Sequence, residues 1–599
     1  MVNADAVLVL QRSDVACIEQ QRERFAGVPL LCIDPGILDA VVQAGLPDYQ
    51  LRRLEVPASI SSKAYTQALA LASSVDMALT TERQRLWGGD ALHGWDQSLL
   101  YLTLQRAFTQ QALGRVVEQG FPEARLGLLR PGNPALFHWD AMLYAEIVGA
   151  DTARWSVVAR YPQGRTWNPA VLDLVPDTAA LQAQLDALVG ASGSVALTHI
   201  PTCFYDARTF AQAIESAFEH NVDVASTYCD VPVRRRGAPA LRPLQPSDLD
   251  ERSLRYQERA RLVLFDAWRA LVPNLPALEQ QVEALARRCL LQAVTFNGLR
   301  QGLARWPQNK PLQLVISDHD VGFHGPLFSA AAERGHPITV LPHSAYPTSV
   351  MPHGQRVTVV ERDGVGVPVR TVLGAPVVCR AVRFRAPVEA VARGRPQRVC
   401  LLLNTMLAEG ISHVELFALM GFHRQLAGLC QQHGVALVVR AKPGSPALGV
   451  LSGALRVPAA ELAAAIHQPL EEAARQADIC VAFGEPTSAT SAFLDAGSYL
   501  IHVSQQDWPL DYLITTPLRG SVMPSFGCEA ALAHLQRLLN EPAIYSQQLQ
   551  AQSALYASRC QGAHDHIFER AVAHPDPTTQ TLPEAPAAPQ QTREAALAP

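Results

Sequence analysis

The segment from Ala477 to Val503 constrains the fold more than any other part of the chain. Two short apolar runs, Ile479–Phe483 and Tyr499–Val503, stand on either side of a stretch with four hydroxyl residues. Runs of this length are typical of buried strands, and the Gly-Glu-Pro turn at 484–486 predicts a loop after the first run. A short helix is expected at Ala492–Ala496. The segment therefore predicts strand, loop, helix and strand, the unit from which parallel sheets are built.

The same alternation recurs along the chain. Strands are expected at Val7–Leu10, Pro29–Ile33, 195–200, Leu312–Ser317, Ile338–Leu341, Arg398–Leu403 and Val435–Arg440. Helices are expected at Ile37–Ala44, Ala207–Phe218, Asp250–Arg305 (with a break near Pro273 and Pro276), Pro326–Arg334 and Val414–Gln432, and residues 60–150 are mainly helical in pattern. Strands that alternate with helices favour the α/β class.

The chain has 599 residues, and a single core stops growing beyond about 250–300 residues, so more than one domain is expected. Residues 386–396 hold two prolines, a glycine and two arginines, which indicates a linker. We expect an N-terminal α/β and helical region (1–250), either part of the domain that follows it or appended to that domain. A Rossmann-like domain (251–390), a second Rossmann-like domain (391–562) and a disordered tail rich in Pro and Ala (563–599) follow.

Composition and charge exclude several classes of protein. The net charge is −5 and the tight basic cluster Arg234–Arg236 stands beside glycine and proline, so no nucleic-acid partner is expected. No stretch reaches the ~18 apolar residues of a membrane helix, and the N-terminus does not read as a signal peptide. The eleven cysteines form no Cys-x-x-Cys pair, which is typical of reduced thiols. We expect a cytoplasmic protein, and peripheral association with the inner face of the cytoplasmic membrane stays open.

The polar stretch after the strand at 479–483 is the candidate phosphate site. Thr487, Ser488, Thr490 and Ser491 supply four hydroxyls close to the start of a predicted helix. Free backbone amides at a helix start, together with hydroxyl donors, favour an anion such as a phosphate or diphosphate. Capping of the helix would account for one hydroxyl but not for four.

A cationic candidate lies at the end of a neighbouring predicted strand. Strand Val435–Arg440 leads to Lys442, and Pro443-Gly444 then turns the chain. Arg440 and Lys442 are two positions apart, so in a strand both side chains point the same way. Lys442 alone is typical of a surface lysine. Combined with the hydroxyl loop and its Glu485, it predicts a site that holds a nucleotide phosphate.

Titratable residues gather where two strands of the first Rossmann-like domain end. Asp318, His319 and Asp320 follow the strand at 312–317, and His343 follows the strand at 338–341. His343 is the candidate general base, because an imidazole titrates near neutral pH. Asp318 or Asp320 is the alternative base, or orients the histidine. No HExxH motif or fixed Cys/His spacing accompanies these residues, so neither a metal nor another cofactor is expected.

Over residues 312–503 the chain resembles the GT-B glycosyltransferases, and more narrowly those of bacterial surface-polysaccharide biosynthesis. The resemblance lies in the acidic strand end and histidine of 317–344, in Arg440–Pro443 and in Pro486–Ser491. Such transferases have His-Gly where this chain has His343-Ser344. The dipeptide recurs ten residues later in Pro352-His353-Gly354, so His353 is the alternative base. Motifs of P-loop kinases, NAD enzymes and serine hydrolases (GxxxxGK[ST], GxGxxG after a strand, GxSxG) do not occur.

The resemblance implies two Rossmann-like domains that face a cleft, with 251–390 as the acceptor domain and 391–562 as the nucleotide-sugar-binding domain. It also implies a metal-independent transfer from a nucleotide-sugar donor to a glycan or lipid-linked acceptor of lipopolysaccharide or capsule. Lys442, Thr487 and Ser488 would neutralise the leaving phosphate, while His343 or an acidic neighbour deprotonates the acceptor. Glu485 and Asp495 are ten positions apart, unlike the Glu-x7-Glu pattern of retaining enzymes, which favours inversion. The alternatives are a nucleotide-sugar 2-epimerase, a CDP-polyol phosphotransferase of the same architecture and a non-enzymatic assembly protein.

Overall fold

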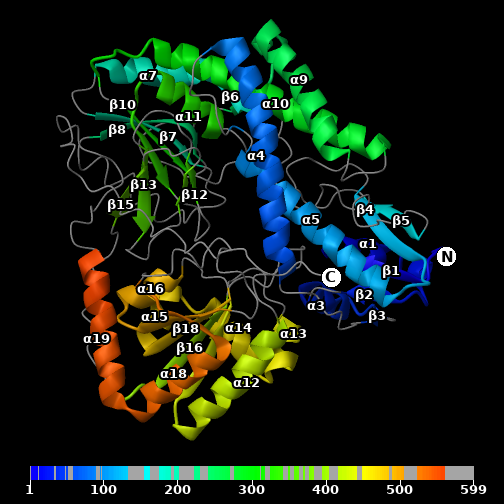
Figure 1. The fold of residues 1–599 in the computed structure, drawn as a ribbon, viewed down its shortest axis with the longest axis vertical. Coiled ribbons are helices and arrows are strands. Elements are labelled where there is room, and N and C mark those ends of the chain that lie inside the picture. The colour runs from blue at the N-terminus through cyan, green and yellow to red at the C-terminus, as the bar shows by residue number, and fades with distance from the viewer. Residues whose placement is uncertain are drawn as a thin grey trace, which may run out of the picture.

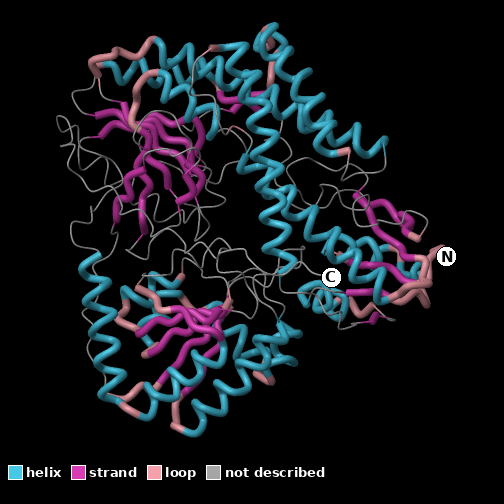
Figure 2. The backbone as a smooth tube through the Cα atoms, in the orientation of Figure 1, coloured by secondary structure: helices cyan, strands magenta, loops and turns pink. Residues whose placement is uncertain are grey.

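The fold is described from a computed structural model of the chain. It describes residues 2–10, 12–32, 35–46, 49–50, 59–88, 95, 97–131, 154–161, 174–190, 194–200, 222–229, 241–269, 275–310, 312–317, 324–341, 348–350, 357–362, 369–371, 377–382, 394–403, 416–441, 448–484, 489–504 and 522–559. These residues form an α/β protein with three parallel sheets of five or six strands each, drawn as magenta strands in Figure 2. The α/β class predicted from the sequence is therefore confirmed.

The N-terminal sheet has five parallel strands in the order β3-β2-β1-β4-β5. Its strands are β1 (Ala6–Val9), β2 (Leu30–Cys32), β3 (Tyr49–Gln50), β4 (Leu126–Pro131) and β5 (Trp155–Tyr161). Helices α1 (Arg12–Gln20), α2 (Arg22–Phe25) and α3 (Pro35–Gln43) accompany it, and the long helices α4 (Ser59–Trp87) and α5 (Gln97–Gly120) follow. This region thus has a sheet of its own.

The middle sheet has six parallel strands in the order β15-β13-β11-β10-β7-β8. Its strands are β7 (Ser194–Ile200), β8 (Val222–Cys229), β10 (Leu312–Ser317), β11 (Ile338–Leu341), β13 (Val357–Arg362) and β15 (Val377–Val382). Helices α7 (Thr178–Val189), α9 (Glu251–Trp268), α10 (Leu275–Ala304) and α11 (His324–Glu333) belong to this unit. The sheet takes strands from both sides of the expected boundary at 250/251.

Small elements complete the middle unit. Strands β6 (Leu174–Pro176) and β9 (Leu241–Pro243) pair antiparallel, and the 3-10 turn η3 (Pro246–Asp248) precedes α9. Strands β12 (Thr348–Val350) and β14 (Val369–Thr371) pair in parallel as a separate two-stranded sheet.

The C-terminal sheet has five parallel strands in the order β17-β16-β18-β19-β20. Its strands are β16 (Arg398–Leu403), β17 (Ala436–Arg440), β18 (Ile479–Phe483), β19 (Tyr499–Ser504) and β20 (Ser525–Gly527). The helices are α12 (Leu416–Gln432), α13 (Leu448–Leu455), α14 (Ala459–His467), α15 (Leu470–Gln476), α16 (Thr490–Asp495), α18 (Cys528–Asn540) and α19 (Pro542–Arg559). In Figure 1 this unit lies below the middle sheet, and α16 lies on the side that faces it.

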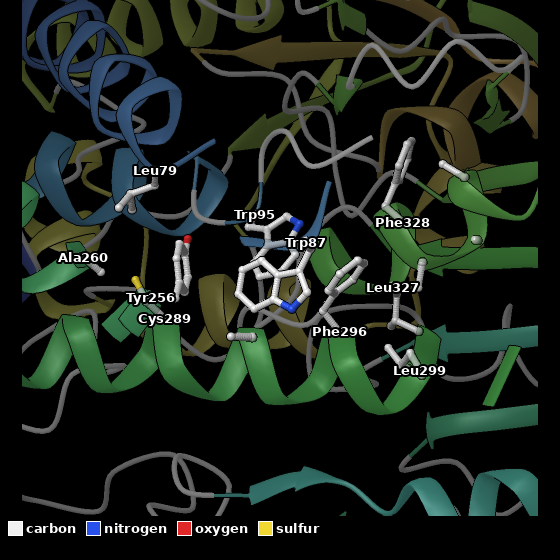
Figure 3. Packing of buried hydrophobic residues seen from close by; sticks show 14 of the residues in the cluster. Leu79, Trp87, Trp95, Tyr256, Ala260, Cys289, Phe296, Leu299, Leu327 and Phe328 are labelled. Carbon is white, nitrogen blue, oxygen red and sulfur yellow. The ribbon is translucent and has the colours of Figure 1, made fainter. Parts of the chain in front are cut away.

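An aromatic cluster ties α4 to the helices of the middle unit. Trp87 and Trp95 lie between Tyr256 of α9 and Phe296 of α10 (Figure 3), with ring centroids 5.1–5.9 Å apart. Trp95 Nε1 also donates a hydrogen bond to Ser329 Oγ in α11 at 2.9 Å. Aromatic pairs at such distances contribute about 0.5–1.5 kcal/mol beyond the area they bury. The cluster therefore anchors α4 firmly to the unit that contains β10 and β11.

Most sequence expectations that fall on described residues are confirmed. Strands β10, β11, β16 and β18 have the predicted bounds, and the long helical stretch divides into α9 and α10 as the prolines predicted. Gly335 and Gly434 have φ of +77° and +65°, as expected where helices end in glycine. Within 60–150 the structure differs, because β4 follows α4 and α5. The expected helix at 207–218, most of the linker and the tail lie outside the described residues.

Two further properties bear on the composition. No helix among the described residues is long and apolar enough to cross a membrane. Cys32, Cys400 and Cys480 lie in strands β2, β16 and β18 and are buried, as small apolar side chains would be.

Candidate functional site

The C-terminal sheet reverses its strand order beside β16. From β16 the chain places β17 on one side and then β18 on the other. In open parallel sheets, ligands bind beyond the carboxyl ends of the strands at such a switch point. The two predicted phosphate-binding segments, 440–443 and 485–491, begin at or just after the carboxyl ends of β17 and β18. The ends of the two strands therefore lie at this edge of the sheet.

The strand register places the carboxyl ends of β17 and β18 at the same level. Leu402 of β16 pairs with Arg440 on one side and with Ala482 on the other. Neighbouring strands lie ~4.8 Å apart, so Arg440 and Ala482 are separated by about 10 Å across β16. Lys442 and Gly484 each follow two residues later in the sequence.

The described part of the hydroxyl segment begins at Ala489. Ala489 is the N-cap of α16, and because its side chain has no acceptor, side-chain capping by the N-cap residue is absent here. Thr490 is buried at 2% exposure in the first turn of α16, and Ser491 is half-buried. Helix α16 has six residues, and Tyr556 of α19 donates a hydrogen bond to Asp495 Oδ1 at its end (2.6 Å). Glu485, Thr487 and Ser488 lie outside the described residues.

Arg440 lies inside the unit. Its side chain is 5% exposed, and Nη1 donates a hydrogen bond to the carbonyl of Ala465 in α14 at 2.5 Å. Burial lowers the pKa of its guanidinium, against weaker opposing effects of Cys400 and Glu471. The guanidinium thus joins the end of β17 to α14. Lys442 lies outside the described residues.

Gly484 marks the point where the chain leaves β18. Its φ is +78°, a value that glycine adopts without strain, and its amide donates to the carbonyl of Val503 at 3.0 Å. His502 of β19 lies against the other side of this residue, with Nε2 2.6 Å from the Gly484 carbonyl oxygen. Its Nδ1 lies 2.7 Å from Ser525 Oγ in β20. Sequence analysis missed His502, because no local pattern separates it from other residues of an apolar strand.

The middle sheet places two strand ends side by side. Strands β10 and β11 are neighbours, and Ser317 at the end of β10 pairs with Leu341 at the end of β11. These ends are therefore ~5 Å apart, and Asp318 and Pro342 follow them in the sequence. Strand β12, which precedes His353, belongs instead to the separate two-stranded sheet. Asp318, Asp320, His343 and His353 themselves lie outside the described residues.

Among the described residues, no group of three or more His, Cys, Asp or Glu side chains is arranged to hold a metal ion. The segments 318–323 and 342–347, which contain His319 and His343, are outside this set.

Comparisons with known proteins give only distant likenesses. No family model and no curated protein matches the chain. Among solved structures it is similar to MurG of Acinetobacter baumannii, with 10% identity and a TM-score of 0.33 over 62% of this chain and 96% of that one. It is similar to a trehalose 6-phosphate synthase of Burkholderia multivorans, with 12% identity and a TM-score of 0.34 over 63% and 94%. The spinosyn forosaminyltransferase SpnP gives 13% identity and a TM-score of 0.32 over 63% and 96%.

These neighbours are GT-B glycosyltransferases, the fold family that the sequence resembles. With TM-scores of 0.32 to 0.34, the likenesses neither assign the chain to a family nor identify its substrate.

Proposed function

We propose that this chain is a GT-B glycosyltransferase that moves a sugar from a nucleotide-sugar donor to a surface glycan or lipid-linked acceptor. The observation that carries the proposal is the register of the C-terminal sheet. It places the ends of β17 and β18 at one level on either side of β16, with Lys442 and the hydroxyl segment following in the sequence. The two strand ends are about 10 Å apart, and a lysine cation with several hydroxyl donors suits the two phosphates of a nucleotide-sugar.

The proposed donor half of the site stabilises the leaving group. Lys442, Thr487 and Ser488 face the diphosphate, with Glu485, Thr490 and Ser491 in the same segment. Charge builds up on the diphosphate as the glycosidic bond breaks, and fixed donors are most effective at the place where that charge develops. Arg440 adds positive charge from inside the unit, at the end of β17, where its bond to the Ala465 carbonyl holds it. The proposal gives a divalent metal no role.

The proposed acceptor half supplies the base. Asp318 and His343 follow adjacent strands whose ends are paired, so one can orient the other. His343 takes the proton from the acceptor hydroxyl as the oxygen attacks the anomeric carbon, which inverts the configuration there. Asp320 is the alternative base. His353 fits less well, because the strand before it belongs to a different sheet.

Nucleotide binding tests the proposal. Titration calorimetry of the wild-type chain with CMP, CDP, UDP and GDP should reveal one preferred base. Lys442→Ala and the double change Thr487→Ala with Ser488→Ala should each weaken that binding. Arg424→Ala is the matched control, because it removes an exposed cation from α12 of the same unit. A wild-type chain that binds no nucleotide, or equal binding by all variants, would refute the proposal.

Product analysis separates the related reactions. His343→Ala should keep nucleotide binding and lose transfer to an acceptor. A nucleotide-sugar incubated alone that yields a new epimer would identify a 2-epimerase instead. A preference for CDP together with transfer of a polyol phosphate would identify the phosphotransferase.

A further inference from the structure

His502 connects three strands at the carboxyl edge of the C-terminal sheet. It pairs with Ala482 of β18 and with Ser525 of β20, and its side chain is 1% exposed. Nε2 lies 2.6 Å from the carbonyl oxygen of Gly484, and Nδ1 lies 2.7 Å from Ser525 Oγ. Both ring nitrogens of this histidine therefore have a partner inside the protein.

The partners decide which nitrogen carries the proton. A carbonyl oxygen can only accept, so Nε2 carries the hydrogen and donates to Gly484. Nδ1 then accepts from the Ser525 hydroxyl. Burial lowers the pKa of His502 to about 4, partly opposed by its bond to Gly484, so near neutral pH the ring is uncharged and carries its one hydrogen on Nε2.

Gly484 is held through both of its backbone polar groups. Its amide donates to Val503 and its carbonyl accepts from His502, so β19 fixes the peptide groups on either side of this residue. Gly484 is the last described residue before the segment 485–488, which carries Glu485, Thr487 and Ser488. Gly484 is thus the last point at which the described backbone is fixed before this segment.

We infer that His502 is a positioning residue for the donor phosphate site. Its imidazole fixes the Gly484 turn, so that the hydroxyl segment leaves β18 in the direction that meets the diphosphate. The inference rests on the proposed function for its ligand. It goes further by giving a role to a residue that touches neither donor nor acceptor and that acts through the backbone of Gly484.

The competing explanation is that His502 only stabilises the fold. A side chain of α19 that bonds to the same strand, β19, provides the control. Gln552 of α19 is 7% exposed; its Oε1 accepts from the Leu500 amide at 2.8 Å and its Nε2 donates to the Leu500 carbonyl at 2.7 Å. Gln552 therefore bonds to both the amide and the carbonyl of one residue of β19. His502 and Val503 together do the same for Gly484. Leu500 lies inside β19, however, and not at the start of a candidate binding segment.

The experiment compares His502→Leu, His502→Gln, Ser525→Ala and Gln552→Leu by calorimetry with the nucleotide that the wild-type chain prefers, and by thermal unfolding. His502→Leu removes the donor to Gly484 and should weaken binding about tenfold, the equivalent of 1.4 kcal/mol. His502→Gln places an amide N–H near the position of Nε2 and should restore most of that affinity. Ser525→Ala keeps the bond to Gly484 and should have a smaller effect. Gln552→Leu should lower the melting temperature and leave the affinity unchanged.

Amide hydrogen exchange of a peptide that spans 480–491 reports on the turn without any ligand. Exchange should be faster in His502→Leu and close to wild type in His502→Gln. Wild-type affinity and exchange in His502→Leu would overturn this inference but not the proposed function. An equal loss of affinity in His502→Leu and Gln552→Leu would have the same consequence. A wild-type chain that binds no nucleotide overturns the proposed function, and with it this inference.

Discussion

Asp39 and Gly449 are 410 residues apart in the sequence, and Asp39 Oδ1 accepts a hydrogen bond from the amide of Gly449 at 3.0 Å. The same carboxylate accepts from the amide of Val450, and its Oδ2 accepts from Gln43 Nε2 at 2.7 Å. Asp39 lies in α3 and Gly449 in the first turn of α13, so a side chain of the N-terminal unit caps a helix of the C-terminal unit. Helix α13 follows the segment that contains Lys442 in the sequence.

Replacing Asp39 by alanine should destabilise the protein by about 1 kcal/mol. Asp39 is 5% exposed, and the variant leaves the amides of Gly449 and Val450 without the acceptor that satisfies them now. Urea unfolding monitored by circular dichroism measures the change. Asp39→Asn keeps one oxygen acceptor and should recover part of the loss. Wild-type stability in Asp39→Ala would show that the cap does not form in solution.

Two glycines of α13 provide a matched pair for the same contact. A Cβ on Gly449 would lie 2.4 Å from Asp39 Oδ1, whereas a Cβ on Gly453 meets nothing within 4 Å. Gly453→Ala should stabilise the chain by up to about 1 kcal/mol, because alanine favours a helix over glycine. Gly449→Ala should destabilise it in the wild-type background and lose that effect when combined with Asp39→Ala. Equal effects of the two substitutions would contradict the observed approach of α3.

The strands that frame the candidate site could be predicted because their signals are local. Strands β10, β11, β16 and β18 are short apolar runs, and polar, Gly or Pro residues that cannot continue a strand stand near their ends. The same local signals show which side chains follow each strand, and for this reason the residues after β10 and β11 were the predicted catalytic candidates. The order of strands within each sheet depends on contacts far apart in the sequence, and no local pattern encodes it.

The same distinction explains what sequence analysis missed. Strand β4 has the sequence LGLLRP, in which the glycine and the proline disfavour a strand. It forms because β1 and β5 lie on either side of it. The cap by Asp39 and the bond from His502 to Gly484 join residues 410 and 18 positions apart. Arg440 was expected to face a phosphate, but the acceptor that its Nη1 finds, the Ala465 carbonyl, comes from a helix 25 residues further on.

Arg83 should be far more important for stability than its neighbour Arg85. Arg83 is fully buried, bonds to Asp76 Oδ1 (2.8 Å), Thr80 Oγ1 (2.6 Å) and Tyr256 Oη (2.6 Å), and lies 5.0 Å from the Trp95 ring. Removing one member of a buried ion pair costs about 3–5 kcal/mol, so Arg83→Ala should cost that much. Arg85 pairs with Glu82 from a side chain that is 66% exposed, and Arg85→Ala should cost less than ~1 kcal/mol. Denaturant midpoints of the two variants measure the difference, and similar midpoints would refute the prediction.

Gly325→Ala should reduce both stability and transfer. A Cβ at this position would lie 2.5 Å from the Cα of Trp95, so the first turn of α11 or the Trp95 backbone has to move. Such overpacking costs about 1–3 kcal/mol. Helix α11 begins at His324, four residues after Asp320, so the shift should also lower the turnover number for transfer. Gly428→Ala in α12 is the control, because a Cβ there meets nothing within 4 Å. Full turnover in Gly325→Ala would show that the contact between α11 and Trp95 does not affect the proposed catalytic segment.

His336 should make the protein sensitive to acid. Burial, and to a lesser degree Arg334, lowers its pKa from 6.5 to about 4, and among the described residues Nε2 has no hydrogen-bond partner. Between these two pKa values the unfolded chain binds more protons than the folded one, so the free energy of unfolding falls as the pH drops through that window. Between about pH 7 and about pH 4.5 this histidine should account for a loss of about 2 kcal/mol in the free energy of unfolding.

His502 contributes a loss of the same sign, so His336→Leu should reduce the acid-induced loss without abolishing it. Urea unfolding at the two pH values measures this, with His467→Gln, a change at an exposed imidazole, as the control. An unchanged difference between the two pH values in His336→Leu would show that this imidazole is not buried as neutral in the folded protein.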